Sequence, residues 1–146
     1  MITTFQAITK KTETGLQVDC ESGGFKLIID EPEASGGTNT GMTPLHAQLC
    51  ALGACQSIVA AAFAQANNFT FEEFYAELEG DIDLDGFMGI ADVPKGFQEI
   101  RFAYHFKTDE PQEKCDEFAK FIQATCPIGE TLQNGVKLVC TGAIKD

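Results

Sequence analysis

Two cysteines are the residues of this chain best suited to carry out chemistry. Cys55 lies in a largely apolar helical run that starts at Met42, and Cys126 precedes Pro127, where a helix restarts. A cysteine at a helix start has its sulfur beside free backbone N–H groups, which favour the thiolate. Cys55 lies in mid-helix and would need a charged or hydrogen-bonding neighbour from elsewhere in the fold. The pair indicates redox chemistry by cysteine alone, with simple core packing as the open alternative.

Other kinds of reaction centre are disfavoured by residue spacing. Zinc needs three or four converging ligands, whereas the chain has only two histidines and no Cys-x-x-Cys motif. His46 and Cys55 share one predicted helix but lie about 13 Å apart along its axis, too far for a Cys–His nucleophile pair. Residues 81–86 match most of a calcium-binding loop. The alternating pattern before them and Pro94 after them indicate instead a strand that ends in a turn.

The composition is that of a globular protein with a sizeable core. The chain has 146 residues, of which 44% are hydrophobic, and this predicts a single domain over residues 1–146. Its net charge of −12 argues against nucleic acids and anionic membranes as partners, because both are bound through basic surfaces. We see no signal-peptide pattern at the start and no stretch of about 20 apolar residues. We therefore expect a cytoplasmic protein with no membrane span.

The six cysteines are expected to be free thiols. They are spread through a chain of core-forming size with no secretion signal, a context in which a disulfide framework is not expected. Most of them are expected to be buried as small apolar residues.

The first half of the chain predicts an antiparallel meander followed by a long helix. Residues 3–9, 16–20 and 25–29 are alternating segments separated by turn residues, which predicts three strands. Residues 31–41 predict a loop. Thr43 is predicted to cap a helix that has Pro44 in its first turn and runs to about residue 67. Because this helix is apolar around most of its circumference, we expect it to be buried on most sides.

The second half predicts a hairpin, two helices and a last strand. Residues 75–85 and 97–107 alternate, with one acidic and one partly basic polar face, which predicts cross-strand charge pairs. A helix is predicted from Pro111 to Thr125, a short helix from Pro127 to about Gln133, and a final strand over residues 136–144. The order βββ-α-ββ-α-α-β predicts an α+β domain.

Two motifs together resemble those of the OsmC/Ohr family (osmotically inducible protein C and organic hydroperoxide resistance proteins). The first comprises Gly37-Thr38-Asn39, Pro44 and the run Ala-Leu-Gly-Ala-Cys that ends at Cys55; the second is Cys126-Pro127. The predicted order of elements is similar along essentially the whole chain. The resemblance implies an intertwined homodimer in which antiparallel sheets are wrapped around long central helices. It also implies a thiol-dependent peroxidase that needs no metal and no organic cofactor.

The same resemblance implies the roles of the two cysteines. Cys55 would be the peroxidatic cysteine, which attacks the O–O bond of a small organic hydroperoxide and becomes a sulfenic acid. Cys126 would be the resolving cysteine, which condenses with that sulfenic acid to form a disulfide. A dithiol such as a lipoyl group would then reduce the protein.

The chain departs from the active members of the family at two positions. Those members stabilise the thiolate with an arginine from the N-terminal region, held by a glutamate just after the helix-entry proline. Here Leu45 and His46 follow that proline, and the one arginine is Arg101, on a strand whose polar face would pair it with carboxylates. Lysine is an imperfect substitute for arginine. The chain therefore resembles a divergent branch of the family.

Two functions are therefore considered. The first is reduction of organic hydroperoxides by Cys55 and Cys126. The second is a binding protein or redox sensor of the same fold, for an apolar or thiol-bearing small molecule. We favour the first, because cysteines without a chemical role need not occupy both of the family's positions.

Overall fold

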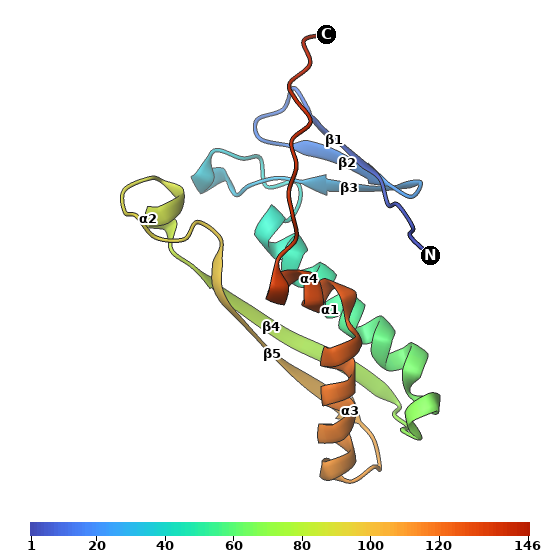
Figure 1. The fold of residues 1–146 in the computed structure, drawn as a ribbon. Coiled ribbons are helices and arrows are strands. Elements are labelled where there is room, and N and C mark those ends of the chain that lie inside the picture. Colours follow the sequence, from blue (N-terminus) through green and yellow to red (C-terminus); the bar gives the residue numbers. More distant parts are fainter. The chain divides into compact units, whose positions relative to one another are not determined.

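The computed structural model describes all 146 residues, which form two compact units, residues 1–50 and residues 51–146 (Figure 1). The architecture is α+β with two antiparallel sheets, as the sequence predicts. Helix α1 (Pro44–Phe63) begins in the first unit and continues into the second. That the two units make one domain stays a prediction.

A three-stranded antiparallel meander makes up most of the first unit. Its strands are β1 (Ala7–Lys11), β2 (Val18–Ser22) and β3 (Phe25–Ile29), paired in that order. The predicted meander is confirmed, with β3 at its predicted bounds and the other two strands shifted toward the C-terminus. Gly23 and Gly24 make the tight turn between β2 and β3 with φ of 59° and 81°, values that glycine adopts at no steric cost.

The loop after β3 is organised by one buried carboxylate. Asp30 accepts hydrogen bonds from the hydroxyl and backbone N–H groups of Thr38 and Thr40 and from the N–H of Glu31. These bonds, the two threonine hydroxyls first among them, hold the pKa of Asp30 far below its usual range. The predicted loop over residues 31–41 is therefore confirmed, with one short 3-10 helix at Glu33–Ser35.

The start of α1 follows the predicted capping pattern. The hydroxyl of Thr43 accepts a hydrogen bond from the His46 N–H at 3.2 Å, and Pro44 is the first helical residue. This cap satisfies a backbone donor that the first turn leaves without an intrahelical partner. The helix ends at Phe63, four residues before the predicted end, and a 3-10 turn follows over Gln65–Asn67.

Helix α1 is less buried than its apolar sequence predicts. Only five of its residues are buried, namely Leu52, Gly53, Gln56, Val59 and Ala60. The expectation of burial on most sides is wrong for the single chain, because nothing in it covers Ile58, which is 68% exposed. The helix has 20 residues, and an 18-residue window within it has a mean hydropathy of 1.4, so by length and composition alone it could cross a membrane. The expectation that no such apolar stretch exists is therefore wrong. The buried face of the helix nevertheless forms part of a protein core.

A long hairpin forms the sheet of the second unit. Strands β4 (Glu73–Ile82) and β5 (Phe97–Lys107) pair antiparallel. The predicted cross-strand charge pairs are confirmed: Arg101 on β5 binds Glu79 at 2.9 Å and Asp81 at 2.7 Å on β4. The apolar residues of both strands lie on the opposite face, toward the helices.

The connection within the hairpin contains a short helix that the sequence did not predict. Helix α2 (Leu84–Phe87) begins after Asp83, whose carboxylate accepts a hydrogen bond from the Asp85 N–H at 2.9 Å. This cap explains the difference, because an Asp two residues before the Asp-Gly pair starts a helical turn as readily as it starts a plain turn.

Two further helices complete the core of the second unit. These are α3 (Gln112–Thr125) and α4 (Pro127–Asn134), close to their predicted bounds. The core cluster consists of Val59, Ala60, Phe69, Phe118 and Ile122. The rings of Phe69 and Phe118 stack at 4.6 Å. Aromatic packing therefore fixes α3 against α1 and the hairpin.

The predicted final strand is absent. Residues 135–146 have no helix and no strand (Figure 1), and Leu138 and Ile144 are each 89% exposed. The alternating pattern of this segment is real, but a strand forms only where another strand accepts its hydrogen bonds. No strand of this chain pairs with it, and the prediction is therefore wrong for the single chain.

Replacing Phe118 with alanine tests the aromatic core. Phe118 is 3% exposed, so Phe118→Ala is expected to lower the free energy of unfolding by about 3–5 kcal/mol. Glu117→Ala, at the exposed neighbouring position of the same helix, is the matched control and should change it by less than about 0.5 kcal/mol. Urea denaturation measures both. Equal effects of the two substitutions would contradict the assigned core.

Candidate functional site around Cys55 and Cys126

Cys126 occupies the junction of two helices and caps both of them. Its N–H donates to the Ile122 carbonyl at the end of α3, and it is the residue before Pro127, the first residue of α4. A residue that precedes proline is disfavoured in the helical region, and Cys126 is extended, with φ −71° and ψ 112°. The chain therefore turns at Cys126, whose Sγ accepts a hydrogen bond from the Gly129 N–H at 3.3 Å.

The cap at Cys126 is confirmed, but the thiolate that was expected there is not. Cys126 is only 2% exposed. This burial raises the pKa of its thiol, the N–H of Gly129 lowers it, and the neighbouring Cys55 side chain raises it again. The net effect is a raised pKa, because burial disfavours the charged thiolate more strongly than one N–H donor stabilises it. In the reduced protein the thiol of Cys126 therefore keeps its proton at neutral pH.

The structure brings Cys55 next to Cys126. Cys55 is half-buried on α1 and packs against the core cluster, and its side chain lies close enough to Cys126 to raise the pKa of that thiol. The first turn of α4 lies against the same part of α1, because a Cβ on Gly129 would lie 3.6 Å from the Cys126 Sγ and 3.8 Å from a methyl of Leu52. Two thiols far apart in the sequence thus form one site.

The other cysteines are less buried than expected. Only Cys126 is buried, and Cys50 and Cys140 are exposed, so the expectation that most of the six are core residues is wrong. All six are free thiols, in agreement with the sequence.

Two buried polar side chains of the second unit were missed in the sequence. Gln56 is 1% exposed and follows Cys55 on α1, and Tyr104 lies on the inner face of β5. The buried Oε1 of Gln56 and the buried hydroxyl of Tyr104 have no hydrogen-bond partner. A signal was present in each case: a glutamine within an apolar helical run, and a tyrosine between phenylalanines at inward positions of the strand.

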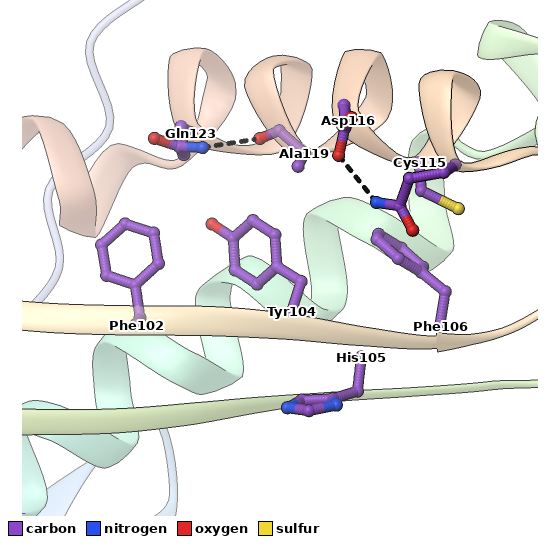
Figure 2. Close-up of a pocket in the computed structure, with 9 residues that line it drawn as sticks. Phe102, Tyr104, His105, Phe106, Cys115, Asp116, Ala119 and Gln123 are labelled. Carbon is purple, nitrogen blue, oxygen red and sulfur yellow. Dashed lines mark hydrogen bonds between the residues drawn. The ribbon is translucent and has the colours of Figure 1, made fainter.

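A groove lies between β5 and α3, with a volume of about 400 Å³ (Figure 2). Phe102, Tyr104 and Phe106 point from the strand toward the helix and form its aromatic floor. Helix α3 contributes the polar side chains Gln112, Asp116 and Gln123 and the thiol of Cys115. No Lys or Arg lines the groove and Asp116 contributes a carboxylate, so its chemistry suits a partly apolar small molecule that is not an anion.

The one arginine of the chain is engaged away from the thiol pair. Arg101 is held by Glu79, Asp81 and Glu99 on the outer face of the hairpin, and hydrogen bonds to these carboxylates, that of Asp81 first, raise its pKa.

The two histidines also have partners of their own. His105 Nε2 lies 3.0 Å from a Glu77 oxygen, and His46 Nδ1 lies 3.0 Å from the Thr43 hydroxyl. No three His, Cys, Asp or Glu side chains converge as metal ligands would.

The raised pKa of Cys126 predicts how stability changes with pH. Above about pH 8.5 the unfolded chain loses this thiol proton while the folded protein retains it. The unfolded state then binds fewer protons, so the free energy of unfolding should fall as pH rises from about 8 to 10. Cys126→Ala should remove part of this fall. Cys115, whose pKa burial also raises, accounts for a further part that Cys115→Ala removes.

Urea denaturation of the reduced protein at several pH values measures this effect. Equal pH dependence in the wild type and both alanine variants would contradict the assigned burial of these thiols.

Comparisons with known proteins agree with this architecture. Residues 37–141 match the family described as OsmC-like protein. An OsmC-like protein from Mycoplasma pneumoniae superposes with a TM-score of 0.80 at 23% identity, over 92% of this chain and 91% of that chain. An organic hydroperoxide resistance protein OsmC from Legionella pneumophila superposes with a TM-score of 0.68 at 18% sequence identity, over 91% of each chain. An organic hydroperoxide resistance protein from Elizabethkingia anophelis, with thiocyanate bound, superposes with a TM-score of 0.68 at 13% sequence identity, over 92% of this chain and 91% of that chain.

At these identities the structural likeness shows the fold alone, and no curated protein matches the chain. The family match covers well over half of the residues. This chain therefore belongs to the OsmC-like protein family.

Proposed function

We propose that this protein reduces organic hydroperoxides with Cys55 as the peroxidatic and Cys126 as the resolving cysteine. The observation that carries the proposal is that Cys55 on α1 lies near Cys126 at the junction of α3 and α4, close enough to raise the pKa of the Cys126 thiol. Two thiols that lie near each other in the folded chain can form a disulfide with less rearrangement of the backbone than two thiols held far apart. Organic hydroperoxide resistance proteins among the solved structures share this fold.

The reaction uses only sulfur chemistry. The thiolate of Cys55 attacks the terminal oxygen of the hydroperoxide, the O–O bond breaks, and the alkoxide takes a proton from water and leaves as an alcohol. Cys55 is oxidised by two electrons and becomes a sulfenic acid. Cys126 loses its proton and attacks the Cys55 sulfur, the S–O bond breaks, and hydroxide leaves as water. A small dithiol, of which a lipoyl group is one example, then reduces the disulfide by exchange.

The different burial of the two thiols supports this division of roles. Cys55 is half-buried and can meet a substrate, whereas Cys126 is 2% exposed. A buried thiol with a raised pKa reacts slowly with peroxide in solution, because the thiolate is the nucleophile. Cys126 is therefore protected until the sulfenic acid of Cys55 forms beside it. Neither step needs a metal ion or an organic cofactor.

We also propose that the active form is an intertwined homodimer. The single chain leaves apolar residues exposed on α1 (Ile58), on the sheet of the first unit (Phe25) and in the unpaired C-terminal segment (Leu138, Ile144). A second copy would bury them and supply a strand partner for residues 136–144. The six free thiols fit a reducing compartment such as the cytoplasm.

A second candidate function is a binding protein or redox sensor of the same fold. Two observations favour it: Arg101 is occupied by three carboxylates, and a groove of about 400 Å³ with an aromatic floor lies beside α3. In that case an apolar or thiol-bearing small molecule would bind, and the two cysteines would oxidise slowly or serve as packing.

Oxidation of the reduced protein by cumene hydroperoxide tests the cysteine roles. One equivalent of hydroperoxide is expected to produce a disulfide between Cys55 and Cys126, identified by peptide mass mapping. Cys55→Ser should abolish hydroperoxide consumption, whereas Cys126→Ser should still react and accumulate a sulfenic acid that dimedone traps. Cys140→Ser, at an exposed thiol, is the control and should behave as the wild type. Disulfides formed at random among the six cysteines would contradict the proposal.

Light scattering after size exclusion tests the homodimer. The wild type is expected to have twice the chain mass of 15.8 kDa, and deletion of residues 136–146 should shift the protein toward monomer or aggregate. A stable wild-type monomer at micromolar concentration would contradict the assignment.

A further inference from the structure

Two buried polar atoms in the second unit, Gln56 Oε1 and the Tyr104 hydroxyl, have no hydrogen-bond partner. Buried polar groups in folded proteins are nearly always hydrogen-bonded, since an unpaired group loses its hydration without compensation. Phenylalanine would fill the position of Tyr104 equally well, because its ring already packs 5.5 Å from those of Phe74 and Phe102. The hydroxyl therefore needs an explanation other than packing.

Gln56 lies on the buried face of α1, one residue after Cys55 and one turn after Gly53. Gly53 rests against β4, because a Cβ at this position would lie 2.7 Å from a methyl of Leu78. The chain reverses direction between α1 and β4, so the next turn of the helix places Gln56 near the level of Ala76. Gln56 thus lies between the thiol of Cys55 and the inner face of the hairpin.

Tyr104 approaches the same region from β5. It pairs with Ala76 across the hairpin, and its hydroxyl points toward the turn of α3 that contains Ala119 and Gln123 (Figure 2). Cys126 lies one turn beyond Gln123. Burial raises the pKa of Tyr104, and the neighbouring Cys126 side chain raises it further. The phenol therefore keeps its proton at neutral pH and can act as a donor.

The two unpaired atoms have complementary hydrogen-bonding character. The Tyr104 hydroxyl can donate and Gln56 Oε1 can accept, which is what a bound O–H group requires. We propose that Tyr104 and Gln56 bind the oxygen atom that a hydroperoxide transfers to Cys55. This inference rests on the proposed function, because the sulfenic acid of Cys55 is the oxygen-bearing group that would enter this place.

The chemistry follows the steps given above. As the O–O bond breaks and the S–O bond forms, Tyr104 donates a hydrogen bond to the oxygen being transferred. The transferred oxygen keeps its hydrogen throughout, and Gln56 Oε1 accepts that hydrogen both during the transfer and in the resulting S–O–H group. Both residues keep their own protons, the sulfur supplies two electrons, and the departing alkoxide is protonated by water. A donor aimed at charge that develops only during the reaction lowers the barrier.

This arrangement fits the rest of the molecule in two ways. It places a hydrogen-bond donor at the thiol pair of a chain whose one arginine is held by carboxylates elsewhere. Both unpaired atoms are also shielded within the single chain, so a second copy cannot satisfy them unless these side chains move.

Tyr104→Phe tests the inference, because it removes one hydroxyl and keeps the ring. The variants are made in a Cys50→Ser background. No Lys or Arg lies between Lys26 and Lys95, so the tryptic peptide that carries Cys55 then has no second cysteine. Two rates are measured by the loss of free Cys55: oxidation by cumene hydroperoxide and alkylation by iodoacetamide.

Tyr104→Phe is expected to slow oxidation about tenfold or more, as loss of one such donor does. Alkylation should stay within about twofold of wild type, since iodoacetamide transfers no oxygen and needs no oxygen-binding donor. Gln56→Met should show the same selective loss and serves as the second variant if Tyr104→Phe does not fold. Tyr75→Phe is the matched control, because this second tyrosine is 54% exposed on the outer strand face. Both of its rates should be unchanged.

Unchanged oxidation in Tyr104→Phe and Gln56→Met would overturn the inference. So would equal slowing of oxidation and alkylation, which would indicate a purely structural role. A third outcome concerns the wild type itself, namely that its Cys55 is oxidised no faster than free cysteine. It would overturn the proposed peroxidase function and this inference with it.

Discussion

The site depends on one local constraint, the proline after Cys126. Pro127 has no N–H to continue α3, and it disfavours a helical conformation at the residue before it. Cys126 is therefore extended, ends α3 and begins α4, and its sulfur turns to the N–H of Gly129. Because Leu52 lies against the same turn, the sulfur is buried at α1, where Cys55 lies. With another residue in place of Pro127, α3 could continue and the sulfur would point elsewhere.

The same packing supports both the stability of the second unit and the site proposed for its chemistry. Ile122, in the aromatic core, supplies the carbonyl that accepts the N–H of Cys126. Cys55 packs against the same core from α1. A site built on helices fixes the relative position of two sulfur atoms more closely than a site built on loops could. That burial raises the pKa of the Cys126 thiol, which supports the proposed role of a residue that reacts second, with a sulfenic acid formed beside it.

Local sequence signals predicted most elements, and the failures have physical causes. Strand β5 and the break at Pro127 were predicted because strict alternation and proline act locally. The strand over residues 136–144 failed because strand pairing depends on a partner that this chain does not contain. The prediction of a thiolate at Cys126 was wrong, because the argument from helix capping counts the nearby N–H donors but does not include the effect of burial on the pKa. Gln56 and Tyr104 were missed because an unsatisfied atom can be recognised only after the surrounding side chains have been placed.

The most direct test of the account is the second-order rate constant for the reaction of the reduced protein with cumene hydroperoxide, measured by stopped flow at neutral pH beside free cysteine. The account predicts a rate at least about a hundredfold above that of free cysteine, since positioning and hydrogen bonding together supply factors of this size. A rate equal to that of free cysteine would contradict it, and the chain would then be a binding protein of the OsmC fold.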